Sequence, residues 1–330
     1  MNPRTDGLRA AASVLRTAST PRVRTVFLGS GGFGLDALRR LAAHPDVDLV
    51  GVVTAPPRPA GRKQQLKNTV IDDQATQLGM PTILRPERLR AAEAVADVFA
   101  LRPQLLVLAD YGQIVPGTLL DLEHGALNLH PSLLPRHRGA TPIPAAILAG
   151  DTETGVTLMR MDEGLDTGPI VAQRRVALDG SETTPGLEEA LTTVAGDLLE
   201  ESLAPWIGGE LTPAAQPDAG GTMTAPLTRE DGRMDPRKRA DVLEREVRAF
   251  MPWPGSFVDT AEGRLGVLSA SVGSVADRPP GVFGPVGLAA ADRELRLIEV
   301  RPAGGNAMPW EAYLRGHPRI IGTTALASEA

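Results

Sequence analysis

Short apolar segments alternate with helical segments along the first part of the chain, and this alternation constrains the fold more than any other feature. The first segment, residues 23–29 (VRTVFLG), is rich in β-branched residues and ends in glycine, which is typical of a buried strand. A helical pattern follows at residues 35–43 and a second apolar segment at residues 48–54 (DLVGVVT). A strand, a helix and a strand in this order predict parallel strands with a right-handed crossover.

The same alternation continues and predicts the class of the larger domain. Further elements are expected as helices at residues 69–78 and 90–100 and as strands at residues 81–84, 105–110 and 125–130. Strands that alternate with helices indicate a doubly wound α/β domain with a mostly parallel sheet. We place this domain at residues 22–207.

The second part of the chain has a different organisation. Residues 208–226 are rich in glycine, proline and small residues, which indicates a linker. Beyond it, residues 241–250 (DVLEREVRAF) have a helical pattern, and closely spaced apolar runs follow. These runs predict a smaller C-terminal β-barrel of the OB type at residues 227–319. We expect residues 1–21 to be a poorly ordered extension and residues 320–330 a tail.

The composition excludes several kinds of catalytic and metal site and bears on binding to nucleic acid and membranes. The chain has no cysteine, which excludes disulfides, thiolate metal ligands and cysteine nucleophiles. Its five histidines include no pair at a helical metal-binding spacing, so we expect no metal. A net charge of −6 is unusual for a nucleic-acid-binding protein, so RNA binding has to be argued from a motif. No apolar run reaches the roughly 20 residues of a bilayer span. We therefore expect a cytoplasmic protein without membrane contact, and we also expect a monomer.

Residues 128–139 (NLHPSLLPRHRG) combine side chains that are suited to catalysis. Asn128 and His130 lie two apart at a predicted strand end, so their side chains point to one face. Ligands bind beyond the carboxyl ends of such strands. An amide and an imidazole aimed at one point can donate hydrogen bonds to a developing oxyanion. Farther along, Asp166 lies in the segment GLDTG. A nearby aspartate raises the pKa of a histidine and favours the imidazolium, the better electrophile.

The residues alone leave a structural interpretation open. Strand-end histidines often have structural hydrogen bonds, and an aspartate between glycines is common in turns. A serine hydrolase is disfavoured because the GxSxG nucleophile elbow is absent. Gly29, Gly31 and Gly34 match the GxGxxG fingerprint of dinucleotide-binding proteins, but the next strand ends at Thr54 without a carboxylate for the ribose. We therefore reject NAD and interpret these glycines as a structural turn.

The pattern N-x-H-x-S-L-L-P at residues 128–135, together with Asp166, resembles the signature of the 10-formyltetrahydrofolate-dependent formyltransferases. Members of this family formylate methionyl-tRNA, glycinamide ribonucleotide or sugar amines, or hydrolyse formyltetrahydrofolate. The resemblance implies formyl transfer from 10-formyltetrahydrofolate, with Asn128, His130 and Asp166 as the catalytic trio and without a metal.

Several further segments are similar to those of the family members that act on methionyl-tRNA. They are the loop TAPPRPAGRKQQL at 54–66, RPERL at 85–89, YGQIVP at 111–116, GLDTG at 164–168 and VRAFMPWPG at 247–255. The resemblance runs from about Val23 to about Arg319. The chain departs from the usual pattern at residues 29–34, where GSGGFG replaces G-T-P-x-F-A. Another departure is Pro57, where an aspartate is usual. Gln64 and Gln65 are uncharged, so fewer basic residues follow Arg62 and Lys63 than is usual.

The resemblance also implies the binding residues. Backbone amides of residues 111–116 and of residues 162–164 would line an apolar slot for the pterin, and Ser132 would be a turn residue. The implied folate contacts are Tyr111, Gly112, Gln113, Ile114, Val115, Ser132, Leu133, Leu134, Pro135, Asp162 and Gly164. For tRNA, the resemblance implies phosphate contacts near the acceptor end by Arg58, Arg62 and Lys63. The structural alternative is that these three are solvated loop charges.

The implied function is transfer of the formyl group to the free amino group of initiator methionyl-tRNA by direct attack of the amine. His130 and Asn128 would donate to the oxyanion of the tetrahedral intermediate. Asp166 would orient His130 and assist proton movement, directly or through water. Three alternatives stay open. They are formylation of a small amine such as an amino sugar nucleotide, hydrolysis of formyltetrahydrofolate, and folate or RNA binding without catalysis.

Overall fold

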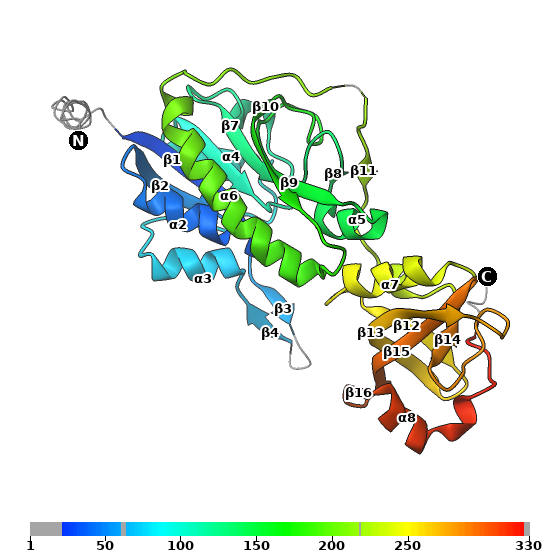
Figure 1. Cartoon of the computed structure of the whole chain (residues 1–330). Helices are drawn as coiled ribbons and strands as arrows, with labels where there is room; N and C mark the ends of the chain where they lie inside the picture. Colours follow the sequence, from blue (N-terminus) through cyan, green and yellow to red (C-terminus); the bar gives the residue numbers. More distant parts are fainter. Residues whose placement is uncertain (1–21, 61–63, 218, 327–330) are drawn as a thin grey trace, which may run out of the picture.

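The larger domain of the computed structural model, which describes residues 22–60, 64–217 and 219–326, is built on a seven-stranded sheet (Figure 1). The strand order is β10-β9-β7-β6-β1-β2-β5. The parallel strands are β1 (Val23–Gly29), β2 (Val47–Val53), β5 (Ile83–Leu84), β6 (Leu105–Ala109) and β7 (Ala126–His130). The antiparallel neighbours are β9 (Glu153–Arg160) and β10 (Ile170–Ala177). The predicted mostly parallel sheet is confirmed.

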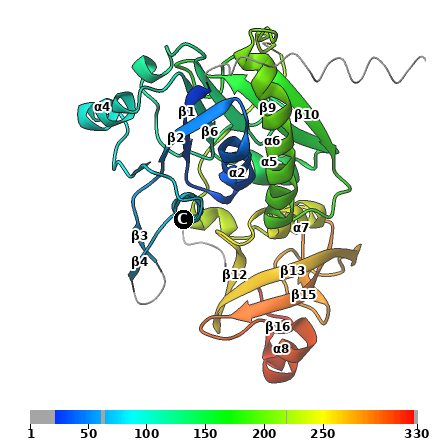
Figure 2. The same ribbon diagram turned by 90° about the vertical axis from the view of Figure 1, so that its left-hand side faces the viewer.

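Both faces of the sheet are buried, because alternate residues of the central strands enter two different cores. In β1, Phe27 packs into one core, whereas Val26 and Leu28 pack into the other. Helices α2 and α6 lie side by side over the first face, and α4 contributes Val98 to the second core (Figures 1 and 2). The helices of this domain are α2 (Leu35–Ala43), α3 (Val70–Gln77), α4 (Ala92–Ala100), α5 (Pro142–Ala149) and α6 (Thr184–Ile207). The doubly wound arrangement is therefore also confirmed.

The smaller C-terminal domain, predicted as a β-barrel of the OB type, is made of antiparallel strands. Its strand order is β12-β13-β15-β14, with β16 beside β15. The strands are β12 (Ser256–Thr260), β13 (Gly263–Val275), β14 (Gly287–Ala289), β15 (Arg293–Pro302) and β16 (Met308–Pro309). Helix α8 (Trp310–Gly316) buries Trp310 between the rings of Phe283 and Tyr313, with centroids 6.1 and 5.6 Å away.

Helix α7 (Ala240–Ala249) joins the two domains. It packs against β13 of the smaller domain and against α5 of the larger one (Figures 1 and 2). Arg245 of α7 donates to the carbonyl of Leu148 at 3.2 Å, and Thr184 Oγ1 donates to the carbonyl of Ala249 at 2.6 Å. These bonds anchor the C-terminal domain beside the end of α5.

Two segments leave the compact domains. The segment between α6 and α7 crosses the larger domain before it descends to α7 (Figure 1). Along it, β11 (Met223–Thr224) pairs in parallel with β8 (Arg138–Gly139). A hairpin of β3 (Arg58–Ala60) and β4 (Gln65–Lys67) projects from the larger domain (Figures 1 and 2). Within the described ranges, no helix has both the length and the apolar character needed to cross a membrane.

Candidate active site

The candidate site forms where β7 ends, between β6 and β9. Asn128 and His130 alternate along β7 with Leu127 and Leu129, which are buried in the core on the opposite face of the sheet. The two polar side chains therefore share the other face. Asp166 arrives from the loop that connects β9 to β10, and Met161 of that loop packs against the core on the Asn128 and His130 side. Strand pairing thus brings together residues that are 36 positions apart.

His130 and Asp166 approach each other as the sequence predicted. The distance from His130 Nδ1 to Asp166 Oδ2 is 3.6 Å, and the two side chains are only 5% and 12% exposed. Asp166 Oδ2 also accepts a hydrogen bond of 2.8 Å from the backbone N–H of Gly139. The carboxylate is therefore held by a backbone donor and lies beside the imidazole ring.

The second ring nitrogen of His130 is already bonded within the protein. Nε2 lies 2.9 Å from the backbone carbonyl of His137. Because a carbonyl oxygen only accepts hydrogen bonds, Nε2 carries the proton in this contact. The remaining nitrogen, Nδ1, faces Asp166.

The expected effect of Asp166 on the His130 pKa is only partly right. Asp166 does raise the pKa, but burial of the ring has a larger effect and lowers the pKa below that of an exposed histidine. Removing an imidazole from water disfavours its charged form, and a carboxylate 3.6 Å away does not compensate fully. Burial therefore keeps the resting ring neutral near pH 7, although Asp166 favours the imidazolium as expected.

Asn128 lies two residues before His130 on the same face of β7, and it is half-buried. Its backbone pairs with Met159 of β9 and Leu108 of β6. No other group in the described part of the chain bonds its side-chain amide. The donors of this amide are therefore available to a substrate.

Residues 111–115, which the sequence predicts to contact folate, form the loop after β6 and differ from one another in burial and bonding. The buried hydroxyl of Tyr111 has no partner among the described residues, and burial raises its pKa. Gly112 and Ile114 are exposed, and Val115 packs against the core. The Gln113 amide is used within the protein, because it accepts from Leu89 N and donates to Pro86 O.

The loop after β9 approaches this segment. A Cβ on Gly117 would lie 2.9 Å from Glu163 Oε1, which shows how close the two loops are. Asp162 closes its own turn by accepting from Gly164 N at 3.0 Å and from Thr167 Oγ1 at 2.8 Å. The structure therefore brings residues 111–115 and 162–164 to one region, although the Asp162 carboxylate is engaged in its own loop.

The predicted contacts at residues 132–135 lie elsewhere around the site. Ser132 is fully buried and donates to the carbonyl of Arg136 at 2.6 Å, consistent with a turn residue. Leu133, Leu134 and Pro135 line a cavity of about 500 Å³. That cavity has neither the catalytic candidates nor residues 111–115 in its lining. We expect folate beside residues 111–115 rather than in this cavity.

Of the basic residues predicted to contact tRNA, the structure describes one. Arg58 lies on the projecting hairpin with a side chain that is 68% exposed, and it forms an ion pair of 2.9 Å with Glu87. Arg62 and Lys63 lie outside the described residues. Within the ranges that are described, no group of three or more potential metal ligands comes together.

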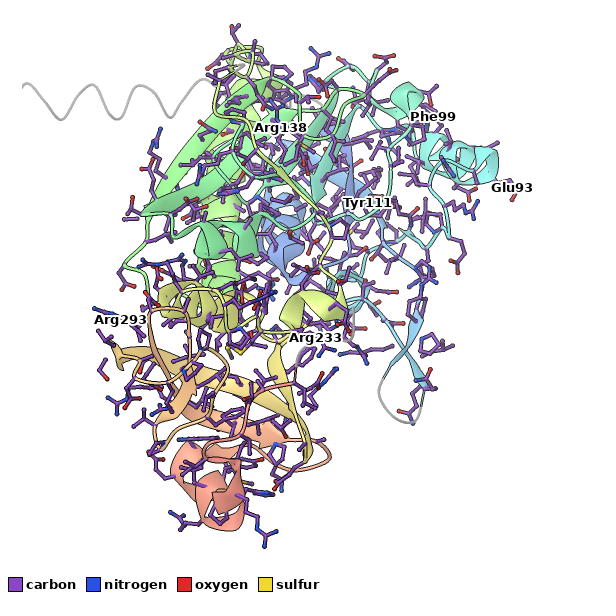
Figure 3. The ribbon with its side chains drawn as sticks, turned by 90° about the vertical axis from the view of Figure 1, so that its right-hand side faces the viewer. Glu93, Phe99, Tyr111, Arg138, Arg233 and Arg293 are labelled. Carbon is purple, nitrogen blue, oxygen red and sulfur yellow. The ribbon has the colours of Figure 1, made fainter. Side chains whose placement is uncertain are left out.

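One group of contacts comes from a segment that the sequence predicts as a linker. Gln216, Thr222 and Thr224 belong to the segment predicted as a linker, yet each bonds the backbone next to the site. Their small-residue, proline-rich context is typical of a solvated connection and carries no signal of this role. In Figure 3 the segment descends past the larger domain, with Arg138 beside it.

Comparison with known families identifies both domains of the chain. Residues 23–203 match the family described as formyl transferase, and residues 226–318 match the formyl transferase C-terminal domain. The chain belongs to the formyl transferase family. It is therefore an enzyme that transfers a formyl group, and the predicted donor, 10-formyltetrahydrofolate, is the donor of this family.

Curated members of the formyl transferase family resemble the chain over most of its length. The methionyl-tRNA formyltransferase of Roseiflexus sp. (strain RS-1) is 42% identical over 304 residues, which are 89% of this chain and 92% of that protein. The methionyl-tRNA formyltransferase of Myxococcus xanthus (strain DK1622) is 39% identical over 307 residues, which are 92% and 97% of the two chains.

Solved structures support the fold. An N-formyltransferase from Helicobacter canadensis matches with a TM-score of 0.59 at 12% identity, over 83% of this chain and 99% of that chain. A sugar N-formyltransferase from Shewanella sp. matches with a TM-score of 0.59 at 17% identity, over 74% and 96%. At these identities the likeness concerns the fold alone.

Proposed function

We propose that this formyltransferase moves the formyl group of 10-formyltetrahydrofolate to the amino group of initiator methionyl-tRNA. The approach of His130 Nδ1 to within 3.6 Å of Asp166, beside an available Asn128 amide, carries the chemical part of the proposal. The tRNA part is supported by relatives at about 40% identity over most of the chain that are named methionyl-tRNA formyltransferases.

Residues 111–115 and 162–168 present surfaces that suit a partly apolar ligand such as folate. Ile114 and Leu165 expose 74% and 60% of their surface although both are large and apolar. The Tyr111 hydroxyl is buried without a partner among the residues described. Burying a hydroxyl without a hydrogen bond costs free energy, so a ligand that bonds it would be stabilised there.

In the proposed mechanism, His130 works through one nitrogen. Its Nε2–H stays bonded to the His137 carbonyl and fixes the ring, so that Nδ1 receives and returns the reaction proton. The amine nitrogen attacks the formyl carbon, the carbonyl becomes an oxyanion, and the amine proton passes to Nδ1 beside Asp166. Collapse of the oxyanion breaks the bond to N10 of the folate, and N10 takes the proton.

Asn128 and the newly formed imidazolium would donate to the oxyanion, and each donor of this kind typically contributes about 10²–10³-fold to the rate. The resting His130 ring is neutral, so Asp166 attracts it only after the ring has taken the reaction proton. This attraction therefore stabilises the charged intermediate and not the ground state. A neutral resting ring also suits acceptance of the amine proton.

The projecting hairpin is the proposed contact for the acceptor end of the tRNA. Arg58 is exposed there, and Arg62 and Lys63 lie between β3 and β4 in the sequence. Basic side chains that contact phosphates position a nucleic acid without reading its sequence. The net charge of −6 makes such a local contact more important, since the whole surface is not attractive to RNA.

The acceptor assay tests the function. Purified protein and 10-formyltetrahydrofolate are incubated with charged initiator tRNA, with an amino sugar nucleotide, or with buffer alone, and transfer and donor loss are followed. We expect rapid formylation of the tRNA only. Faster transfer to the amino sugar nucleotide than to the tRNA would replace the proposal with formylation of a small amine. Loss of 10-formyltetrahydrofolate in buffer alone as fast as with tRNA would replace it with hydrolysis of formyltetrahydrofolate.

The hairpin is tested separately with Arg58→Ala. We expect a higher KM for methionyl-tRNA and an unchanged KM for 10-formyltetrahydrofolate, because one phosphate contact is lost. Arg39→Ala is the matched control, since Arg39 is an exposed arginine of α2 that bonds Gln74. Equal effects of the two variants would remove Arg58 from tRNA binding.

A further inference from the structure

Among residues 214–217, Gln216 is the one side chain that is directed inward to the candidate site. The residues around it, Ala214, Ala215 and Pro217, are exposed, whereas Gln216 is half-buried. Its amide nitrogen donates to the backbone carbonyls of Asp166 at 2.8 Å and Gly168 at 2.7 Å.

The amide oxygen of the same side chain is also fully used. It accepts from Arg138 Nε at 3.0 Å and from Arg138 Nη2 at 2.6 Å. A primary amide offers two donors and an oxygen with two lone pairs, and all four are satisfied here. Such complete satisfaction orients the amide and holds its three partner residues in one arrangement.

Asp166 needs to be held because its backbone is in an uncommon conformation. Its φ of 53° lies in the left-handed region, which residues with a side chain adopt at a cost. The Gln216 bond restrains its carbonyl, and the Gly139 bond restrains its carboxylate. Loss of either restraint would let the carboxylate move away from His130.

The two restraints are connected through the same segment. Gly139, which bonds the Asp166 carboxylate, belongs to β8 together with Arg138, and β8 pairs with β11 of the connecting segment. Thr224 Oγ1 donates to the Arg138 carbonyl at 2.9 Å. The connecting segment thus supports both the backbone and the carboxylate of Asp166.

We infer that Gln216 is a positioning residue for Asp166, so that the connection between the domains is part of the active-site framework. This inference rests on the catalytic role of Asp166 in the proposed function. Gln216 lies behind the Asp166 backbone and contacts its carbonyl, so it acts on catalysis through Asp166.

The kinetic test compares Gln216→Met, which removes all four bonds, with Gln216→Glu, which keeps an acceptor for Arg138 and removes the two donors. We expect both to lower kcat by about 10- to 100-fold, as misplacement of a catalytic group by about 1 Å can do. The KM for 10-formyltetrahydrofolate should change less than the kcat. Thr212→Ala is the control, because Thr212 is an exposed residue of the same segment, and its kcat should stay at the wild-type value.

A double-mutant cycle tests whether Gln216 affects kcat through Asp166. If Gln216 works through Asp166, adding Gln216→Met to Asp166→Asn causes little further loss of kcat. Losses that multiply, or a wild-type kcat in Gln216→Glu, would overturn the inference. If the acceptor assay assigns a different amine to the enzyme, the same variants are compared with that amine.

Amide hydrogen exchange gives a readout that needs no substrate. Gln216→Met should speed exchange in the peptide that spans residues 162–168, whereas Thr212→Ala should not. Unchanged exchange in that peptide would show that Gln216 does not hold the loop, whatever the acceptor proves to be. Failure of the tRNA assay and failure of this inference are therefore separate results.

Discussion

Asp166→Asn is the substitution that tests the proposed chemistry most directly. The variant keeps the size of the side chain and an oxygen that can accept from Gly139 N, so the 2.8 Å bond can persist. Asparagine also tolerates the left-handed backbone that Asp166 adopts at φ 53°. The substitution therefore removes the negative charge and leaves the loop in place.

The size of the effect follows from the distance to His130. At 3.6 Å and an effective dielectric constant of about 20, a carboxylate and an imidazolium attract by roughly 4–5 kcal/mol. Because the resting ring is neutral, this attraction arises only when His130 holds the reaction proton. The dipole of asparagine and local water replace part of it. We expect kcat to fall by about 10²–10³-fold, within the range for loss of one electrostatic contact in a transition state.

The assay measures single-turnover formylation of charged initiator tRNA together with the Kd of a stable reduced folate. We expect a large loss in the rate of the chemical step, a folate Kd within about twofold of the wild type and an unchanged Tm. A single-turnover rate within threefold of the wild type would refute the role of Asp166. A large change in folate Kd would instead place Asp166 in binding.

Two further predictions concern the ring and the loop. Titration of His130 by ¹⁵N NMR should give a pKa below that of an exposed histidine, because the ring is buried. In Asp166→Asn the His130 pKa should be lower still, because Asp166 raises it. A His130 pKa at or above that of an exposed histidine would contradict the burial argument. Gly168→Ala should destabilise the protein by about 1–3 kcal/mol, because its Cβ would lie 1.9 Å from the Arg160 carbonyl oxygen. Gly316→Ala is the control, since a Cβ there meets nothing within 4 Å, and equal Tm values for the two variants would contradict this packing.

The sequence predicts the first βαβ unit closely because its signals are local. Strand β1 (Val23–Gly29) and helix α2 (Leu35–Ala43) have the predicted bounds, and β2 is shifted by one residue. Strands β9 and β10 were not predicted individually. In IVAQRRVA of β10, the edge strand, apolar residues mix with a glutamine and two arginines, whereas ETGVTLMR of β9 lies between β10 and β7 and is charged only at its two ends. Neither pattern is strong evidence for a strand in a single sequence.

The candidate site was predictable in parts that depend on strand periodicity. Asn128 and His130 share a face because they are two residues apart on one strand. The approach of Asp166 depends on β9 pairing with β7, a long-range contact that spacing alone does not give. The effect of burial on the His130 pKa, which exceeds that of Asp166, depends on the three-dimensional environment and could not be predicted from spacing.

The glycine fingerprint after β1 shows how a motif can be satisfied by packing alone. A Cβ on Gly31 would lie 1.5 Å from Asp110 Oδ2, and one on Gly29 would lie 2.7 Å from the Ala109 carbonyl oxygen. Both glycines therefore allow the end of β6 to approach the turn, which accounts for them without a bound dinucleotide. At the end of β2, where a ribose-binding carboxylate would be required, Thr54 instead shares a hydrogen bond of 2.6 Å with Thr69. Glycine spacing reports how closely two backbones approach, and only the chemistry of the neighbouring strand end distinguishes a cofactor from a packing contact.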